Sequence, residues 1–131
     1  MPRRLPVAER AGQQNGSEGP TGEALQALVA ADEPLICDLL TRFLSRRGFA
    51  VTSVGDGEEA IREMRESSPD LLLLDIYLPK LDGLAVLERI RDESLEVGTI
   101  WTMTGKAGDE TVKKSLDLGA ADVFTKPLNL P

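Results

Sequence analysis

The chain has no histidine and a single cysteine among its 131 residues. Without histidine there is no imidazole general base, no imidazole metal ligand and no phosphohistidine carrier. One cysteine, Cys37, cannot form an intrachain disulfide, which is typical of a reducing compartment, so we expect a cytoplasmic protein. Cys37 stands among apolar residues at helical spacing and is interpreted as a small core residue rather than a nucleophile.

Positive charge and long apolar runs are also scarce. The 15 lysines and arginines are outnumbered by 22 aspartates and glutamates, which gives a formal net charge of -7 at pH 7. This balance argues against binding to nucleic-acid phosphates or to anionic lipid. No apolar stretch reaches membrane-spanning length, and no apolar segment follows the N-terminal arginines. We therefore expect no direct nucleic-acid partner, no membrane and no secretory signal.

The first 22 residues differ in composition from the rest. They are rich in glycine, proline and polar residues and offer little to bury, so residues 1–22 are predicted to form a disordered tail. Residues 23–131 are predicted to form one domain, which is long enough to bury a core.

Apolar patterns of strand and helix type alternate from residue 23 onward. Strands are expected at 25–30, 49–54, 71–75, 97–103 and 122–125. Helices are expected from Pro34 up to Gly48 and at 58–65, 83–91 and 109–118. Regular alternation of this kind predicts right-handed βαβ units and an α/β fold with a doubly wound parallel sheet.

A run of four leucines, residues 71–74, leads directly into Asp75 and a proline-glycine turn. A continuous apolar run bounded by turn residues predicts a strand buried on both faces. In sheets of this kind the ligand crevice lies beyond the carboxyl ends of the strands. Taken alone, the segment leaves two interpretations open: Asp75 is a functional carboxylate, or it only starts the next turn.

Five polar side chains are expected at the carboxyl ends of the strands. They are Asp32 and Glu33 after the first strand, Asp75 after the third, Thr104 after the fourth and Lys126 after the fifth. Acidic groups that face each other are hard to keep ionised together unless a cation joins them, and oxygen ligands match Mg²⁺. The ammonium and the hydroxyl would complete a cradle for a phosphoryl group. This combination suggests an aspartyl phosphate.

The segment from Asp75 to Gly83 resembles the phospho-acceptor segment of receiver domains in two-component response regulators. The later motifs of that family are matched, in order, by Thr104-Gly105, Gly119-Ala120-Ala121-Asp122 and Thr125-Lys126-Pro127. Each motif is common alone, but all of them in order make a specific signal over residues 25–128. The resemblance implies a flavodoxin-like fold with a five-stranded sheet of order 2-1-3-4-5.

The resemblance also implies a role for each site residue. Asp75 would accept a phosphoryl group from the phosphohistidine of a sensor histidine kinase or a phosphotransfer protein. Mg²⁺ would be bound by Asp32, Asp75 and the backbone carbonyl of Tyr77. Glu33 is a further candidate ligand of the metal. Lys126 would pair with Asp75 and then with the phosphoryl group.

Two more residues are implied to take part in a switch. Thr104 would hydrogen-bond a phosphoryl oxygen and draw its loop inward, while Gly105 would leave the phosphate open to partner enzymes. The bond between Lys126 and Pro127 is a candidate cis peptide. The implied function is a phosphorylation-dependent switch of a phosphorelay, regulatory rather than enzymatic, that acts on a downstream output domain or protein outside this chain.

The first departure from the family pattern lies after the first strand. Two adjacent acids are usual there, but with Pro34 as the anchor Ala31 takes the first position and Asp32 the second. The loss of that acid is expected to weaken Mg²⁺ binding without abolishing it. A shift of one residue would instead make Asp32 and Glu33 the pair and would turn the strand's side chains to opposite faces.

Two further departures concern the end of the chain. Val123 stands where the family often has tyrosine or phenylalanine, and the adjacent Phe124 is interpreted as a core residue on the opposite face. The family's fifth helix is missing, so we expect part of one sheet face to lie open. A fragment of a longer regulator is the favoured explanation, and a partner that covers the face is the alternative.

Two other functions compete with the phosphorylated receiver. A pseudo-receiver that acts as an interaction scaffold without phosphorylation is favoured by Ala31, Val123 and the missing helix. It is opposed by Asp75, Thr104 and Lys126. A haloacid-dehalogenase-like phosphatase with Asp75 as nucleophile needs a second aspartate two residues later, where this chain has Tyr77.

Overall fold

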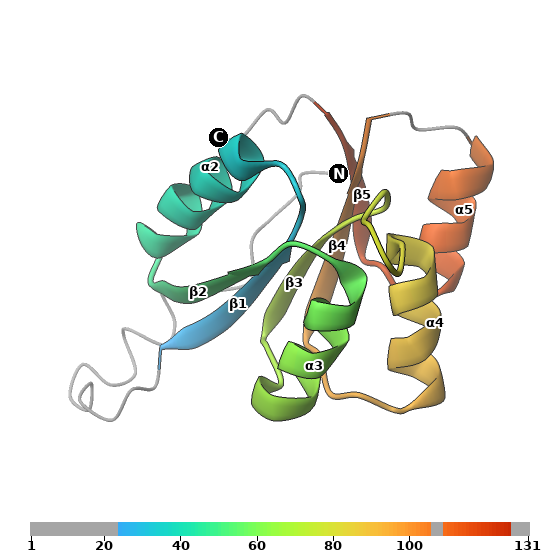
Figure 1. The fold of residues 1–131 in the computed structure, drawn as a ribbon, viewed down its shortest axis with the longest axis horizontal. Coiled ribbons are helices and arrows are strands. Elements are labelled where there is room, and N and C mark those ends of the chain that lie inside the picture. Colours follow the sequence, from blue (N-terminus) through green and yellow to red (C-terminus); the bar gives the residue numbers. More distant parts are fainter. Residues whose placement is uncertain (1–23, 106–108, 127–131) are drawn as a thin grey trace.

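A five-stranded parallel sheet in the order β2-β1-β3-β4-β5 forms the centre of the structure, with helices on both faces (Figure 1). The computed structural model describes residues 24–105 and 109–126. The strands are β1 (Leu25–Ala30), β2 (Phe49–Val54), β3 (Leu71–Asp75), β4 (Thr99–Thr104) and β5 (Asp122–Thr125). The helices are α2 (Pro34–Ser45), α3 (Gly57–Ser67), α4 (Gly83–Asp92) and α5 (Asp109–Asp117). The predicted fold class and strand order are confirmed.

Most element boundaries follow the sequence pattern, and β4 is the main exception. The prediction began this strand at residue 97, but the ladder begins at Thr99, whose N–H donates to the carbonyl of Asp70 at 2.8 Å. At Gly98 the backbone approaches Asp70 so closely that a Cβ would lie 2.2 Å from that carbonyl oxygen. This tertiary contact, which is not visible in the apolar pattern, sets the start of β4.

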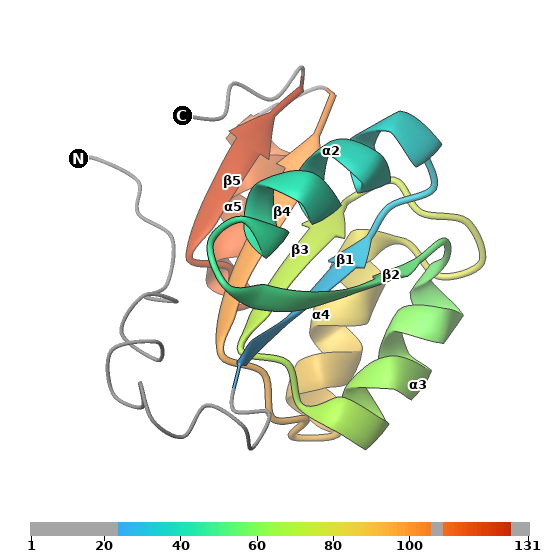
Figure 2. The same cartoon turned by 90° about the vertical axis from the view of Figure 1, so that its left-hand side faces the viewer.

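The two faces of the sheet are covered unequally, as Figures 1 and 2 show. On one face, which we call the three-helix face, α3, α4 and α5 lie side by side. Its buried residues include Leu28, Ile61, Met64, Leu72, Leu87 and Ile100. On the other face, the α2 face, the helix α2 packs with Leu40 and Leu44 buried. Within the described ranges no helix is long and apolar enough to cross a membrane.

The α2 face was expected to lie partly open, and on β4 that expectation is wrong. Trp101 and Met103 point to this face and are only 8% and 0% exposed. The Trp101 ring packs against Phe124 of β5 with the ring centroids 5.0 Å apart, which shields part of both side chains. Phe124 packs against the core, as predicted, and Val123 is buried as well. The predicted tail, residues 1–22, and residues 127–131 lie outside the described residues.

Candidate functional site

Asp75 ends the buried strand β3 and is itself only 2% exposed. The next residue, Ile76, remains bonded to β4 through the carbonyl of Met103 at 2.9 Å. The chain then turns, so that the N–H of Tyr77 donates to Asp75 Oδ1 at 3.1 Å. The leucine run therefore delivers a carboxylate to the sheet edge and holds it within the protein.

The loop that follows Asp75 packs against the backbone of the same residue. Gly83 donates its N–H to the carbonyl of Ile76 at 2.7 Å, and a Cβ at Gly83 would lie 2.5 Å from the carbonyl oxygen of Asp75. Asp82 starts α4 by accepting a hydrogen bond from the N–H of Ala85 at 2.9 Å. In this turn Gly83 thus allows close packing against Asp75, and Asp82 caps the helix.

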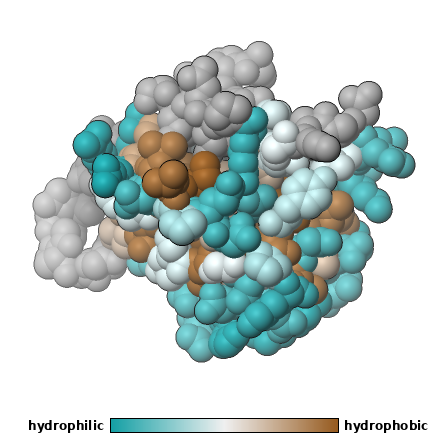
Figure 3. All heavy atoms as spheres, turned by 45° about the horizontal axis from the view of Figure 1, so that its top comes forward, coloured by the Kyte–Doolittle hydropathy of each residue, from teal (hydrophilic) through white to brown (hydrophobic). Residues whose placement is uncertain are grey.

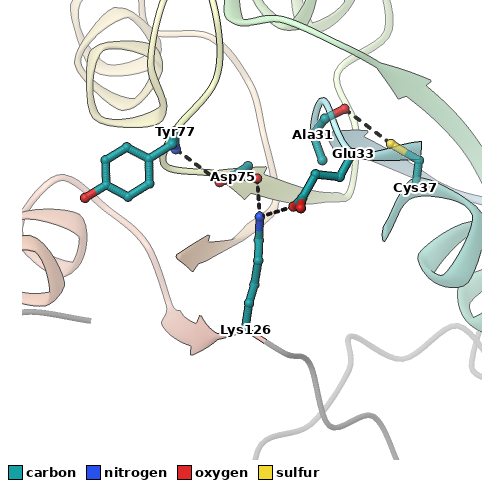
Figure 4. A network of polar contacts seen from close by, with 6 residues as sticks. All are labelled: Ala31, Glu33, Cys37, Asp75, Tyr77 and Lys126. Carbon is teal, nitrogen blue, oxygen red and sulfur yellow. Dashed lines mark hydrogen bonds and ion pairs between the residues drawn. The ribbon is translucent and has the colours of Figure 1, made fainter. Parts of the chain in front are cut away.

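Lys126 joins the ends of three strands at this edge. Its backbone N–H donates to the carbonyl of Thr104 at 2.8 Å, which fixes Lys126 beside the end of β4. Its Nζ donates to Asp75 Oδ2 at 2.6 Å and to Glu33 Oε1 at 2.5 Å (Figure 4). Burial alone would lower the pKa of the ammonium, but the hydrogen bonds and charges of Asp75 and Glu33 together raise the pKa of Lys126 above its ordinary value.

The corner between β1 and α2 carries the other acidic residues. Ala31 is buried and continues the sheet pairing, since its N–H donates to the carbonyl of Val54 at 3.1 Å. Its own carbonyl accepts a hydrogen bond from the Cys37 thiol at 3.3 Å. Asp32 and Glu33 follow at the surface. The position at which the prediction placed the family's first acid thus holds a buried methyl group.

The negative charges of this edge act together on Cys37, which packs at the rim of the core. Burial raises the pKa of the Cys37 thiol, and the charges of Asp32, Asp75 and Glu33 raise it further. Carboxylate oxygens of this kind suit a hard divalent cation, and two of them already share the ammonium of Lys126. In residues 24–105 and 109–126, however, no three side chains of histidine, cysteine, aspartate or glutamate are arranged to hold a metal ion.

The remaining predicted site residues lie near the same edge. Thr104 is the last residue of β4 and is fully buried, while Gly105 is exposed with no atom within 4 Å of a Cβ placed there. The Tyr77 side chain is 59% exposed. Pro127, the partner in the candidate cis peptide, lies outside the described residues. Where the described residues are visible in this oblique view, the surface is mainly hydrophilic and carries some hydrophobic patches (Figure 3).

One feature of the site was missed by the reasoning from sequence. Glu33 was considered only as a metal ligand, whereas its carboxylate forms an ion pair with Lys126. Two features of the sequence are compatible with this pair. More than one acid was expected at the edge where Lys126 follows β5, and glutamate is not among the residues favoured as helix N-caps.

The known family of response regulator receiver domains matches residues 27–131 of this chain. The chain belongs to this family. It is 40% identical over 102 residues to the alkaline phosphatase synthesis transcriptional regulatory protein PhoP of Bacillus subtilis, an alignment that covers 78% of this chain and 42% of PhoP. The chain spans less than half the length of the curated relatives that it matches.

Solved structures of receiver domains share the fold. The Francisella response regulator 1452 receiver domain superposes with a TM-score of 0.75 at 25% identity, over 80% of this chain and 86% of that one. A response regulator of Burkholderia pseudomallei, solved with a phosphorylated aspartic acid, a calcium ion and citrate, has a TM-score of 0.73 at 27% identity, over 80% and 61% of the two chains. The receiver domain described here is thus a regulatory module of two-component systems.

Proposed function

We propose that this receiver domain is switched by phosphorylation of Asp75, with a phosphohistidine of a sensor kinase or phosphotransfer protein as the donor. The single observation that carries the proposal is the buried Asp75 carboxylate, whose Oδ2 lies 2.6 Å from the Lys126 ammonium at the open edge of the sheet. In the transfer, a carboxylate oxygen of Asp75 forms a bond to phosphorus as the bond from phosphorus to the imidazole nitrogen breaks. The electron pair of the broken bond remains on that nitrogen.

The other side chains of the edge support this chemistry. Lys126 carries a positive charge, already hydrogen-bonded to Asp75, that can follow the charge developing on the phosphoryl oxygens. Thr104 at the end of β4 supplies a hydroxyl for one of those oxygens, and Gly105 leaves the approach open. Asp32, Asp75 and the Tyr77 carbonyl would hold Mg²⁺, which neutralises phosphoryl charge when bound.

The proposal is tested by incubating the full chain with acetyl phosphate and Mg²⁺ and measuring the intact mass. We expect one added phosphoryl group in the wild type and none in Asp75→Asn. Asp38→Asn is the matched control, because it removes the same charge from an exposed ion pair with Arg42 on α2. Phosphorylation of Asp75→Asn at the wild-type level would place the acceptor elsewhere.

The second candidate function is a scaffold that acts without phosphorylation. Two observations favour it. Position 31 is an alanine, and the described part of the chain has no group of three histidine, cysteine, aspartate or glutamate side chains that could hold a metal ion. A wild-type chain that gains no phosphoryl group and responds to no Mg²⁺ at millimolar concentration would support the scaffold instead.

A further inference from the structure

Glu33 stands at the start of α2, but its side chain does not cap that helix. Its backbone is extended (φ -100°, ψ 113°), and its carboxylate makes no capping hydrogen bond. At the starts of α3 and α4, by contrast, Asp56 and Asp82 each accept a bond from a backbone N–H of the first turn. The carboxylate of Glu33 is therefore free of the task that an acidic N-cap residue usually has.

That carboxylate reaches across the sheet edge to Lys126. Glu33 Oε1 lies 2.5 Å from Nζ, and the same Nζ lies 2.6 Å from Asp75 Oδ2 (Figure 4). One ammonium thus joins a side chain that is 2% exposed to one that is 53% exposed. Because Glu33 precedes α2 and Lys126 follows β5, this ion pair ties the start of α2 to the far side of the site.

We propose that Glu33 is a positioning residue that competes with Asp75 for Lys126 and loses the ammonium when Asp75 carries a phosphoryl group. The inference rests on the proposed function. An acyl phosphate has more negative charge and more acceptor oxygens than the carboxylate that it replaces, so it attracts the ammonium more strongly. Glu33, at the surface, can exchange Lys126 for water.

The position of Glu33 gives this competition a structural consequence. Ala31, two residues earlier, brings no charge to the edge, so Glu33 is the residue of this corner that holds Lys126. Release of Lys126 removes the ion pair between the start of α2 and the end of β5. Phosphorylation at β3 is thereby communicated to α2 through one side chain.

The test measures the affinity of the full chain for beryllofluoride at saturating Mg²⁺ by fluorine NMR. Glu33→Gln removes the competitor and is expected to bind beryllofluoride about threefold more tightly, the size typical of an exposed ion pair. Glu33→Asp keeps the charge but is one methylene shorter and is a favoured N-cap, so it should behave like Glu33→Gln. Asp38→Asn, the matched control on α2, should keep the wild-type affinity.

The outcomes separate this role from its alternatives. Wild-type affinity in Glu33→Asp with tighter binding in Glu33→Gln would mean that charge alone matters, and would overturn the positioning role. Weaker Mg²⁺ binding by Glu33→Gln, measured without beryllofluoride, would make Glu33 a metal ligand and would also overturn it. Equal beryllofluoride affinities in Glu33→Gln and Asp38→Asn would contradict the positioning role and leave the proposed function intact. If the wild type binds no beryllofluoride, the proposed function itself fails and the role falls with it.

Discussion

The two acidic corners of the sheet edge are built in different ways. At the corner between β3 and α4, both oxygens of Asp75 accept hydrogen bonds from the protein, and Gly83 packs against the Asp75 backbone. At the corner between β1 and α2, Asp32 is exposed and Glu33 is attached to the site through the distant Lys126. Both corners follow parallel strands, yet only at the first does the corner's own backbone hold the carboxylate.

From this difference we expect a rigid corner around Asp75 and a responsive corner around Glu33. Backbone contacts and close packing resist rearrangement because any shift costs several interactions at once. A single ion pair with one exposed partner contributes little and can be exchanged for water. The receiver domain thus holds Asp75, the proposed acceptor, through several contacts, and holds the Glu33 carboxylate through one ion pair.

The largest effect is expected from Lys126→Met, which breaks the link between the two corners. Asp75 then remains buried without its cation, and we expect the free energy of unfolding to fall by about 3 kcal/mol in a metal-free buffer. Urea denaturation monitored by Trp101 fluorescence measures this change. Adding Asp75→Asn to Lys126→Met should recover most of the loss, because the uncompensated charge is then absent.

A control variant and the pH dependence of stability check the origin of the effect of Lys126→Met. Arg42→Met also removes a cation from an ion pair, but both partners are exposed, so its cost should stay within about 0.5 kcal/mol. The pKa of Lys126 is raised above its ordinary value of 10.5, so the stability it contributes is complete below that pH and is lost as the pH rises through the higher folded value. An equal cost for both variants at neutral pH would contradict the distinction.

The next effect is expected from Gly83→Ala, which disturbs the rigid corner directly. Its Cβ would lie 2.5 Å from the carbonyl oxygen of Asp75, so the backbone must shift, at a cost of about 2 kcal/mol in the free energy of unfolding. Phosphorylation of Asp75 by acetyl phosphate should slow as well. Gly55→Ala is the control, because nothing lies within 4 Å of a Cβ there. If Gly83→Ala were as stable as Gly55→Ala, the backbone at this corner could shift at little cost in free energy.

A smaller effect distinguishes the two helix starts. Asp82→Ala removes the cap of α4 and should cost about 1 kcal/mol, whereas Asp82→Asn should retain most of the stability, since asparagine caps equally well. Glu33→Ala removes no cap and should cost less than Asp82→Ala. Thermal unfolding of the three variants in a chelating buffer measures the difference. Equal costs for Glu33→Ala and Asp82→Ala would mean that Glu33 stabilises its own helix after all.

The rigid corner was predictable from the sequence because its signals are local. Four leucines before Asp75 predict a strand buried on both faces, and the proline and glycine that follow predict the turn. The alternation of strands and helices predicted a doubly wound sheet, and the family resemblance implied its strand order. The leucine run and the turn residues lie within a few residues of the structure that they predict.

The responsive corner was not predictable in the same way. Glu33 and Lys126 are 93 positions apart, and only the lengths and directions of their side chains bring the two charges into contact. The start of β4 depends likewise on the approach of Gly98 to Asp70, and the burial of Trp101 on its packing against Phe124. Each of these features is decided by tertiary contacts that no local pattern contains.

The smallest effect is expected from Tyr77→Ala, which separates side chain from backbone at the rigid corner. Tyr77 is 59% exposed, whereas its backbone N–H donates to Asp75 Oδ1 at 3.1 Å. Tyr77→Ala should therefore change the free energy of unfolding by less than about 0.5 kcal/mol. Tyr77→Pro removes the N–H itself and should cost at least about 1 kcal/mol, together with much of the beryllofluoride affinity. If both variants behaved alike, the orientation of Asp75 would depend on the tyrosine ring, and the corner would not be held by its backbone.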